Sequence, residues 1–321
     1  MNCSQPVVNM HTSIMEELFL CLAERGYQGR VISVKHLPEL KEDIEKFQTQ
    51  SLFDKEFYQE CLAWFDFRIP DSLPEAKSII IVAVPRPQSQ AIFTWNGKRK
   101  AFILPPTYAG YDETTKQIQD FLAKILSKRG YSVAPTALPL KLLAVRGGLG
   151  EYGRNNICYV SGMGSFLQLV GAYSDMPCQE DSWQEMQMMQ RCEHCQACRL
   201  NCPTGAISSD RFLLHAERCI VFHGERKGTI PFPAWIDPSW HNCLYGCLRC
   251  QKVCPEDRNF LQWFGEKKEF SQEETALLLE GASYDQLSAA TLRKLEHLSL
   301  AENLDSIPRN LGVFLGKHAN A

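Results

Sequence analysis

The sequence lacks the features that would mark a membrane or secreted protein. Among its 321 residues, no apolar run approaches the ~20 residues that a membrane-spanning helix needs. The first ten residues carry no basic stretch ahead of an apolar core, as a secretory leader would. No long repeat and no low-complexity segment is visible. We therefore expect a globular cytoplasmic protein of two or three domains that does not bind a membrane.

The sequence also has little net charge. Its formal charge is −3, with 45% hydrophobic and 22% charged residues, which is ordinary for a soluble globular protein. Arg86, Lys98, Arg99 and Lys100 form a small basic cluster around a predicted hairpin. Such a cluster is more often a solvated turn than a nucleic-acid site. Charge alone therefore gives no reason to expect a nucleic-acid partner.

Cysteine, by contrast, is abundant: the chain has 14 of them. One run follows the spacing C-x2-C-x2-C-x3-C-P from Cys192 to Pro203, and C-x2-C-x3-C-P follows from Cys247 to Pro255. In proteins with two [4Fe-4S] clusters, three thiolates of one loop bind one cluster and the fourth binds the other. The spacing therefore predicts two clusters that exchange their last ligands.

This pattern assigns most of the cluster ligands. We expect cluster 1 to bind four thiolates, which are Cys192, Cys195, Cys198 and Cys254. Cluster 2 would bind Cys202, Cys247, Cys250 and one further thiolate. On spacing alone, that ligand is either Cys243, which would complete an irregular repeat, or Cys219, which lies between the two motifs.

Structural zinc and disulfides are the alternatives for these cysteines. Zinc takes four thiolates in one tetrahedron and has no use for a crossed fourth cysteine followed by proline. A chain of this length does not need a disulfide framework, and the leaderless sequence suggests a reducing compartment. Six cysteines remain as free thiols, and of these Cys21 and Cys61 fit small core positions.

The remaining pattern predicts an α+β fold. Helices are expected over 13–25, 37–47, 53–65, 118–129, 138–145, 272–279, 284–298 and 308–315, and strands over 30–34, 78–84, 91–95, 98–104 and 165–173. Asn96-Gly97 predicts a type I′ hairpin turn. We expect an α/β domain over 1–182, a ferredoxin-like domain over 183–263, and a short helical cap over 264–321.

A glycine-rich segment precedes the cysteine motifs. Gly148 to Gly153 spells G-x-G-x-x-G, but the residues before it look helical and no βαβ unit is evident, so a dinucleotide site is not indicated. The glycines are compatible with close approach of the backbone to a flat or phosphate-bearing ligand. The alternative is a loop between core elements, which is the commoner case.

Together these motifs resemble the epoxyqueuosine reductase family, relatives of the corrinoid reductive dehalogenases. The resemblance runs from about Ser78 to Asn259 and is tightest in Gly148-Leu149-Gly150, Gly153-Arg154-Asn155, Gly164-Ser165-Phe166, the Cys192 motif, Arg218-Cys219 and Tyr245-Gly246-Cys247. It implies that Cys219 is the fourth ligand of cluster 2. Cys243 falls where the family usually has an aromatic residue.

The resemblance also implies a cofactor. Cobalamin would bind base-off between the α/β domain and the cluster domain, receive electrons from the clusters and carry the reductive chemistry. The sequence has no D-x-H-x-x-G motif, so a histidine ligand of that kind is not expected. The residues implied in cobalamin binding are Gly148, Leu149, Gly150, Tyr152, Gly153, Arg154, Asn155, Gly164, Ser165, Phe166 and His223. An external low-potential donor of ferredoxin or flavodoxin type would supply the electrons.

The chain departs from this family where a proton should be supplied. The family's valine-aspartate pair, whose aspartate is the proposed proton donor, is matched by Val133-Ala134, and a neighbouring family glutamate is matched by Leu140. The family's HEAT-like repeat, which helps to hold tRNA, is matched only by a short helical tail. We therefore expect a reductase that acts on an unidentified substrate other than tRNA. The alternatives are an electron-transfer protein that serves a partner such as a corrinoid protein, or an epoxyqueuosine reductase acting on tRNA.

Another acid would then have to donate the proton. Tyr108, Tyr111 and Asp112 lie on a loop after a predicted strand, where catalytic groups often lie, and dehalogenases use a tyrosine. Alternatively these residues only pack, with Asp112 as the N-cap of a helix that begins near Thr114. Tyr152 in the glycine-rich loop is a further candidate. Three residues follow Cys219 where family members approach the corrin, namely His223, Glu225 and Arg226.

Overall fold

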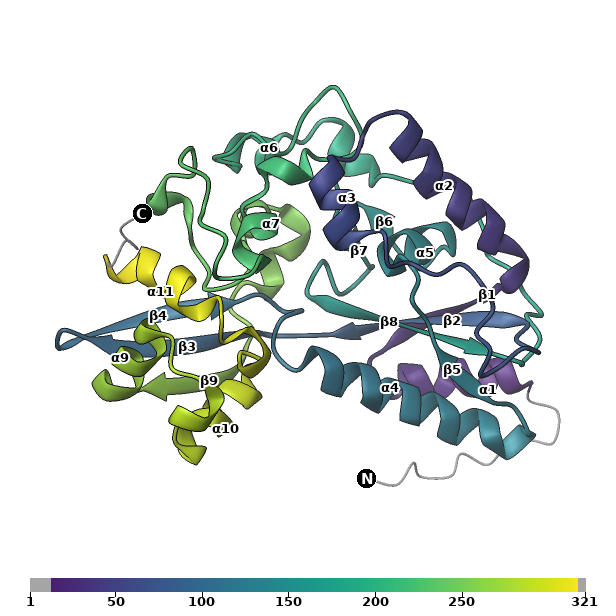
Figure 1. Cartoon of the computed structure of the whole chain (residues 1–321). Helices are drawn as coiled ribbons and strands as arrows, with labels where there is room; N and C mark the ends of the chain where they lie inside the picture. The colour runs from purple at the N-terminus through teal and green to yellow at the C-terminus, as the bar shows by residue number, and fades with distance from the viewer. Residues whose placement is uncertain (1–12, 317–321) are drawn as a thin grey trace.

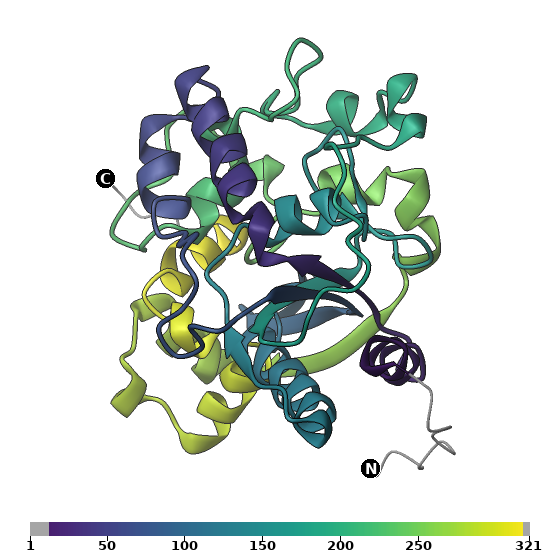
Figure 2. The same cartoon turned by 90° about the vertical axis from the view of Figure 1, so that its right-hand side faces the viewer.

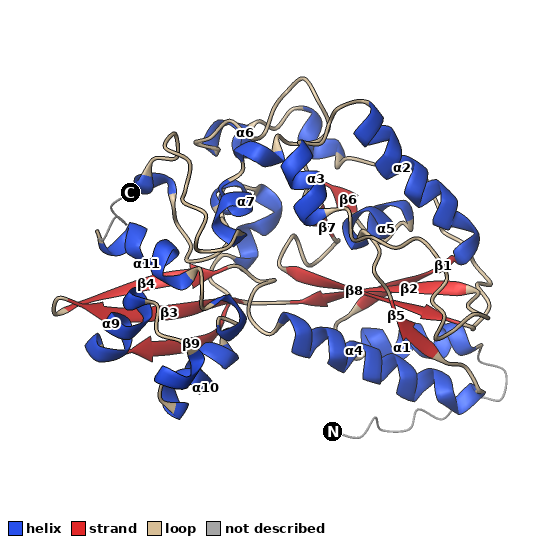
Figure 3. Ribbon diagram, viewed as in Figure 1, coloured by secondary structure: helices blue, strands red, loops and turns tan. Residues whose placement is uncertain are grey.

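The protein is built on two sheets that lie end to end, with the cysteine motifs above them (Figures 1 and 3). The structure, a computed structural model, describes residues 13–316. The larger sheet has four strands in the order β1-β2-β8-β5, and the smaller has three in the order β4-β3-β9. The segment that carries the cysteines is mostly loops and short helices, which is typical of a chain ordered by metal clusters rather than by a large core.

The larger sheet is antiparallel throughout. Its strands are β1 (Gln28–Ser33), β2 (Ser78–Pro85), β8 (Leu167–Ser174) and β5 (Val133–Pro135), and β2 and β8 are buried along almost their entire length. A run of apolar residues without alternation is what a strand covered on both faces requires. The two central strands therefore form the base on which the cavity described below is built.

Helices cover both faces of this sheet (Figure 2). α1 (Ile14–Ala23) and α4 (Tyr111–Leu126) pack against one face. α2 (Leu37–Thr49) and α5 (Leu140–Arg146) cover the other, followed by the short α3 (Lys55–Cys61). On this second face, the chain leaves room between the sheet and the cysteine segment, and this is where the cavity lies.

The smaller sheet begins with the predicted hairpin. β3 (Gln88–Trp95) and β4 (Lys98–Leu104) are joined by Asn96 and Gly97, whose φ angles of 49° and 70° are those of a type I′ turn. β9 (Phe264–Phe270) pairs with β3 in parallel, although 168 residues of chain separate Trp95 from Phe264. The cysteine segment is therefore enclosed between two strands of one sheet.

The tail closes the core of the smaller sheet. α9 (Gln272–Glu280), α10 (Ala289–His297) and α11 (Ile307–Leu315) pack on it around Phe93 and Phe270, whose stacked rings lie 4.6 Å apart. The expected tail helices are confirmed, with the second shortened at its start. The tail is nevertheless more than a helical cap on the cluster domain, because it contributes a strand and completes a second hydrophobic core.

The cysteine segment is joined to the larger sheet by a buried hydrogen-bond network. The backbone N–H and the hydroxyl of Ser165 donate to the two carboxylate oxygens of Asp257, each at 2.7 Å, and the side-chain amide of Gln251 donates to the same hydroxyl at 2.8 Å. Gly164 has a φ of 59°, and a Cβ there would lie 2.5 Å from the Asp257 carboxylate. Only glycine therefore permits this contact.

Two expectations about local structure were wrong. α4 begins at Tyr111 with Gly110 as its N-cap, so Asp112 lies in the first turn and is not the cap. The helix expected over 53–65 ends at Cys61, and the residues after it line the cavity. The other predicted helices and strands occur at or near their expected positions, whereas β5 and β9 were not predicted. No helix within residues 13–316 is long and apolar enough to cross a bilayer.

If β9 is integral to the smaller core, Phe270→Ala will lower the free energy of unfolding by about 3–5 kcal/mol, because a ring that is 1% exposed leaves a cavity. Phe264→Ala, on the same strand but 38% exposed, is the matched control and should cost less than about 1 kcal/mol. Anaerobic urea denaturation followed by circular dichroism measures both. Equal losses would contradict the assigned orientation of β9.

Candidate functional site

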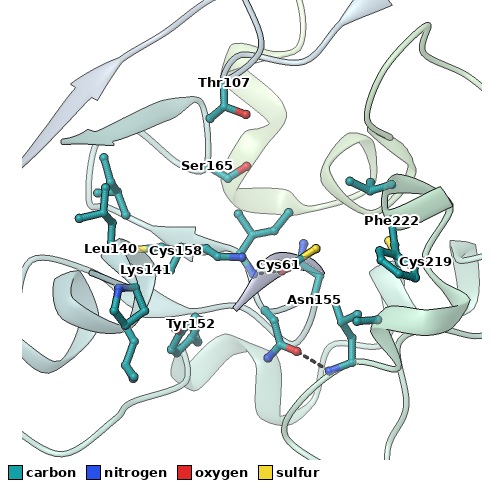
Figure 4. A pocket seen from close by; sticks show the side chains of 18 of the residues that line it. Cys61, Thr107, Leu140, Lys141, Tyr152, Asn155, Cys158, Ser165, Cys219 and Phe222 are labelled. Carbon is teal, nitrogen blue, oxygen red and sulfur yellow. Dashed lines mark hydrogen bonds between the residues drawn. The ribbon is translucent and has the colours of Figure 1, made fainter. Parts of the chain in front are cut away.

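A cavity of about 820 Å³ lies between the larger sheet and the cysteine segment. Its walls come from α3 and the loop after it, the loop after β4, the start of α5, the glycine-rich loop and the cysteine segment. Figure 4 shows Leu140, Lys141 and Tyr152 on the left of the cavity, with Cys219 and Phe222 on the right. The lining is mostly apolar, with a few polar groups, as in sites for large organic cofactors.

Four thiols expected to bind cluster 2 form part of the cavity wall. They are Cys202, Cys219, Cys247 and Cys250. Burial, together with the nearby Cys247 and Cys202 thiols, raises the pKa of Cys219 to about 12. A thiol in this setting becomes a thiolate when a bound metal compensates its charge. Iron ligation therefore suits this group of thiols better than free reactivity does.

Cys243 lies apart from that wall. It is 3% exposed, lies outside the lining of the cavity, and pairs through its backbone with Ile103 on β4. Among the proposed ligand thiols, Cys247 has the main influence on the pKa of Cys243. This placement favours Cys219 over Cys243 as the fourth ligand of cluster 2.

The four thiols expected for cluster 1 meet in a small pocket beside the cavity. Cys192, Cys195, Cys198 and Cys254 line it together with Gly153 and Arg154. The Arg154 guanidinium donates to the backbone carbonyl of Cys192, so a positive charge is held next to the place where a cluster would carry negative charge. The residues present thus fit a cluster at each of the two sites.

Three charged or ionisable side chains meet inside the cavity. The hydroxyl of Tyr108 donates to the carboxylate of Glu225 on α7 (Ile220–Glu225), and Lys141 on α5 is close enough to both the carboxylate and Cys219 to interact electrostatically. A Cβ at Gly246 would lie 2.7 Å from the Tyr108 ring, so this glycine makes room for the tyrosine. Tyr108 is thus held between the smaller sheet and the cysteine segment.

Burial sets the protonation of this group. It raises the pKa of Tyr108 well above its usual value, and the charge of Glu225 and the hydrogen bond raise it further. Burial also raises the pKa of Glu225, against the opposing effects of Tyr108 and Lys141, and lowers the pKa of Lys141. The tyrosine therefore keeps its proton at neutral pH, and this proton is shared in the hydrogen bond to Glu225.

Of the residues implied in cofactor binding, Tyr152, Asn155 and Ser165 line the cavity. The glycines do not serve close approach to a ligand. A Cβ at Gly150 would lie 2.5 Å from the backbone oxygen of Tyr159, and a Cβ at Gly153 would lie 2.5 Å from Oδ1 of Asn155. These glycines allow the loop to pack on protein, which favours the alternative of a loop between core elements. Four more of the set, Gly148, Leu149, Gly164 and Phe166, lie outside the lining of the cavity.

Two further candidates do not contribute to the cavity. His223 packs against Trp235, and its Nε2–H donates to the carbonyl of Glu217 at 2.8 Å, so its polar group is already satisfied by the protein. Asp112 is exposed on α4 and lies outside the lining of the cavity. Tyr111 lines the cavity but is 42% exposed, which leaves Tyr108 as the better placed tyrosine.

Sequence reasoning missed Lys141 and the cavity thiols Cys61 and Cys158. Lys141 had a detectable signal, because it is the one charged residue in the apolar run 138–145. Ala134 is buried in β5 and lies outside the lining of the cavity. A proton for chemistry in the cavity must therefore come from another residue.

Comparison with known proteins supports the cluster assignment first. A family model described as a 4Fe-4S double cluster binding domain matches residues 191–257. The expected domain with two [4Fe-4S] clusters is thereby confirmed, and its matched range contains all eight proposed ligands.

Curated relatives match a larger part of the chain than the family model does. The epoxyqueuosine reductase of Bacillus subtilis is 30% identical over 226 residues, which cover 64% of this chain and 56% of the relative. That of Staphylococcus aureus is 29% identical over 196 residues, covering 58% and 50%. The chain thus spans about half the length of the curated relatives it matches. The resemblance predicted from the motifs is confirmed.

Solved structures are similar to this protein in fold over most of its length. A structure of epoxyqueuosine reductase from Bacillus subtilis has a TM-score of 0.67 at 22% identity, covering 95% of this chain and 81% of that one. An epoxyqueuosine reductase solved with an epoxyqueuosine-modified tRNA-Tyr stem loop has a TM-score of 0.68 at 22% identity, with the same coverage. The predicted fold class is therefore confirmed.

The position of the thiols predicts different effects for two cysteine variants. Cys219→Ala should lower the iron content from eight per chain towards about four, because cluster 2 loses a ligand. Cys243→Ala, which removes a buried thiol away from the cavity wall, is the matched control and should retain nearly all the iron. Iron and sulfide assays after anaerobic purification measure both. A greater loss in Cys243→Ala would reverse the assignment.

Proposed function

We propose that this protein is a cobalamin- and iron–sulfur-dependent reductase of the epoxyqueuosine reductase type. The observation that carries the proposal is that one cavity joins the cluster 2 thiols to a hydrogen-bonded tyrosine–carboxylate pair. A reduction needs electrons and protons delivered to the same place, and this cavity provides a route for each. An electron relay would need no such proton donor, so the pair favours an enzyme over a relay.

The cavity suits a large, flat cofactor such as cobalamin. Tyr152, Asn155 and Ser165 on the side of the larger sheet would contact it, and the cluster 2 thiols lie in the wall shared with the cysteine segment. When bound, cobalamin supplies a metal centre able to carry low-potential reduction. We expect the base-off form, and no imidazole ligand from the protein, because no histidine is among the described residues that line the cavity.

The proton comes from Tyr108 in this proposal. Its hydroxyl points at Glu225, which would orient the tyrosine and exchange protons with it, while the Lys141 ammonium balances the carboxylate charge. This pair takes the role that the aspartate has in the family and that Ala134 cannot perform. Tyr108, Glu225 and Lys141 lie on three segments that are far apart in the sequence, so their positions depend on the complete fold.

For the substrate, the comparisons favour tRNA over the unidentified substrate other than tRNA that was expected from the sequence. The curated relatives are named epoxyqueuosine reductases, and a fold neighbour was solved with a modified tRNA stem loop, whereas nothing found supports a substrate other than tRNA. Ala134 and the short tail bear on proton supply and on affinity, and neither changes the redox chemistry. We therefore propose epoxyqueuosine carried by tRNA as the substrate.

The test combines composition with turnover. The protein, purified anaerobically with added cobalamin, should contain about eight irons and one cobalt per chain and show a base-off Co(II) EPR signal. With a chemical reductant, it should form queuosine in a tRNA-Tyr stem loop that carries epoxyqueuosine. Eight irons without cobalt would refute the enzyme and favour a relay. Cobalt binding without queuosine would refute the proposed substrate alone.

Tyr108→Phe tests the proton donor. It should lower kcat by about 10²–10⁴, the usual contribution of general acid catalysis, and leave the iron and cobalt contents unchanged. Tyr111→Phe is the matched control, because this neighbouring tyrosine is partly exposed and should retain nearly full activity. Stem-loop turnover measured by mass spectrometry decides between them. A larger loss in Tyr111→Phe would transfer the role to that residue.

A further inference from the structure

We propose that the surface over cluster 1 is the docking site of an acidic ferredoxin, which delivers one electron at a time. The surface is formed by residues 191–201 and 249–258, which include α6 (Ala197–Asn201), α8 (Arg249–Lys252) and the residues around Cys254, and is here named the cluster 1 face. The proposal rests on the proposed function only in assuming that electrons travel from the clusters to the cavity. It adds where they enter and what kind of protein brings them.

The direction of electron flow follows from the positions of the thiols. The cluster 2 thiols line the cavity, whereas those of cluster 1 lie outside its lining and meet in the small pocket beside it. Cys198 and Cys250, which belong to different clusters, are close enough for their charges to interact. Cluster 1 is therefore the entry point, and a donor must approach it from outside the cavity.

The cluster 1 face carries unusually exposed apolar side chains. Leu200 is 74% exposed, the highest value among the large hydrophobic residues of the described chain, and Val253 is 37% exposed. Leu200 lies between Cys198 and Cys202 in the sequence. α6, which carries Leu200, is joined to α8, which ends just before Val253, because the side-chain amide of Asn201 donates to the Arg249 carbonyl at 2.7 Å. A leucine this exposed beside two cluster ligands fits a surface that a partner covers.

The charge of the face selects the kind of partner. Within 191–200 and 249–258, the charged side chains on the surface are five basic ones (Arg191, Arg199, Arg249, Lys252 and Arg258) and two acidic ones (Glu193 and Glu256). Arg191 and Glu256 pair at 3.0 Å. A positive surplus therefore remains here, although the whole chain has a net charge of −3. An apolar centre with a basic rim matches an acidic partner, and complementary charge speeds encounter.

A reduced ferredoxin satisfies these requirements. It carries a low-potential iron–sulfur cluster, and an acidic ferredoxin would present negative charge to Lys252 and its basic neighbours. The transfer moves one electron, so the ferredoxin is oxidised by one electron and cluster 1 is reduced by one. No bond forms or breaks and no proton is required, so the face needs only to hold the two clusters close together.

The experiment uses stopped-flow reduction of the anaerobic full-length protein containing both clusters. An acidic plant-type [2Fe–2S] ferredoxin and dithionite serve as alternative reductants, and bleaching of the clusters is recorded. Leu200→Glu and Lys252→Glu should each slow reduction by ferredoxin about 10-fold or more, since both place negative charge on the face. Reduction by dithionite should be unchanged. The wild-type rate with ferredoxin should fall steeply as salt rises.

Leu20→Glu on α1 is the matched control, because Leu20 is 57% exposed on a helix that packs under the larger sheet. It should behave as wild type with both reductants. If Leu200→Glu loses iron, the rate of reduction of Lys252→Glu by ferredoxin becomes the test. Lys252 is exposed and contributes little to folding, so this variant should keep its clusters. Unchanged ferredoxin rates in the iron-replete variants would overturn the proposal. A change in molecular mass by light scattering with unchanged ferredoxin rates would instead identify a self-association surface, which also overturns it.

These measurements separate the docking site from the enzyme. Cluster reduction is recorded without cobalamin and without substrate, so failure to reduce epoxyqueuosine leaves the result intact. Conversely, turnover driven by dithionite in Leu200→Glu should equal that of wild type even when its reduction by ferredoxin is slow. Loss of both would show that the substitution damages the clusters, and Lys252→Glu would then supply the answer.

Discussion

The site depends on the contact between Ser165 and Asp257. The carboxylate of Asp257 is buried and accepts two hydrogen bonds from Ser165, so separating the two segments would leave three polar groups without partners. Burial raises the pKa of this carboxyl to about 6, and the two hydrogen bonds oppose the rise. Asp257 lies three residues after Cys254, and Ser165 lies just before β8. This one contact therefore sets how the cluster ligands face the larger sheet.

The cysteine segment lies between strands of the smaller sheet in the sequence, and this placement also affects the geometry of the cavity. β4 leads into the loop that carries Tyr108, and β9 follows directly after the last cluster ligands, so both flank the cluster segment. The tyrosine, the carboxylate of Glu225 and the thiol of Cys219 thus lie on parts of the chain that the smaller sheet and its helices hold together. The tail therefore matters for the geometry of the cavity, even though none of its residues line it among those described.

The sequence could predict those structural features that are determined by residues close together in the chain. The Asn96-Gly97 turn follows from the φ angles of two residues, and the cluster ligands follow from spacing within short loops. β9 was missed because most of its residues are exposed and show no apolar alternation. The antiparallel order of the larger sheet and the meeting of Tyr108, Lys141 and Glu225 depend on contacts between distant segments. The sequence could identify Tyr108 and Glu225 as separate candidates, but it could not predict that they form a hydrogen bond.

The loss of a carboxylate at Ala134 is compatible with reduction because of where that residue lies. The side chain is buried in the core that covers the second face of the larger sheet, outside the lining of the cavity, so an aspartate there would have to leave this core or lose its charge. Glu225 is exposed to the cavity, next to Tyr108 and near Lys141, where its charge is partly compensated. In the proposed function, a tyrosine hydrogen-bonded to such a carboxylate would release its proton and take a replacement from the carboxyl group after that group has been protonated by water. In the proposed function, the proton would come from the cluster side of the cavity, beside the route proposed for the electrons.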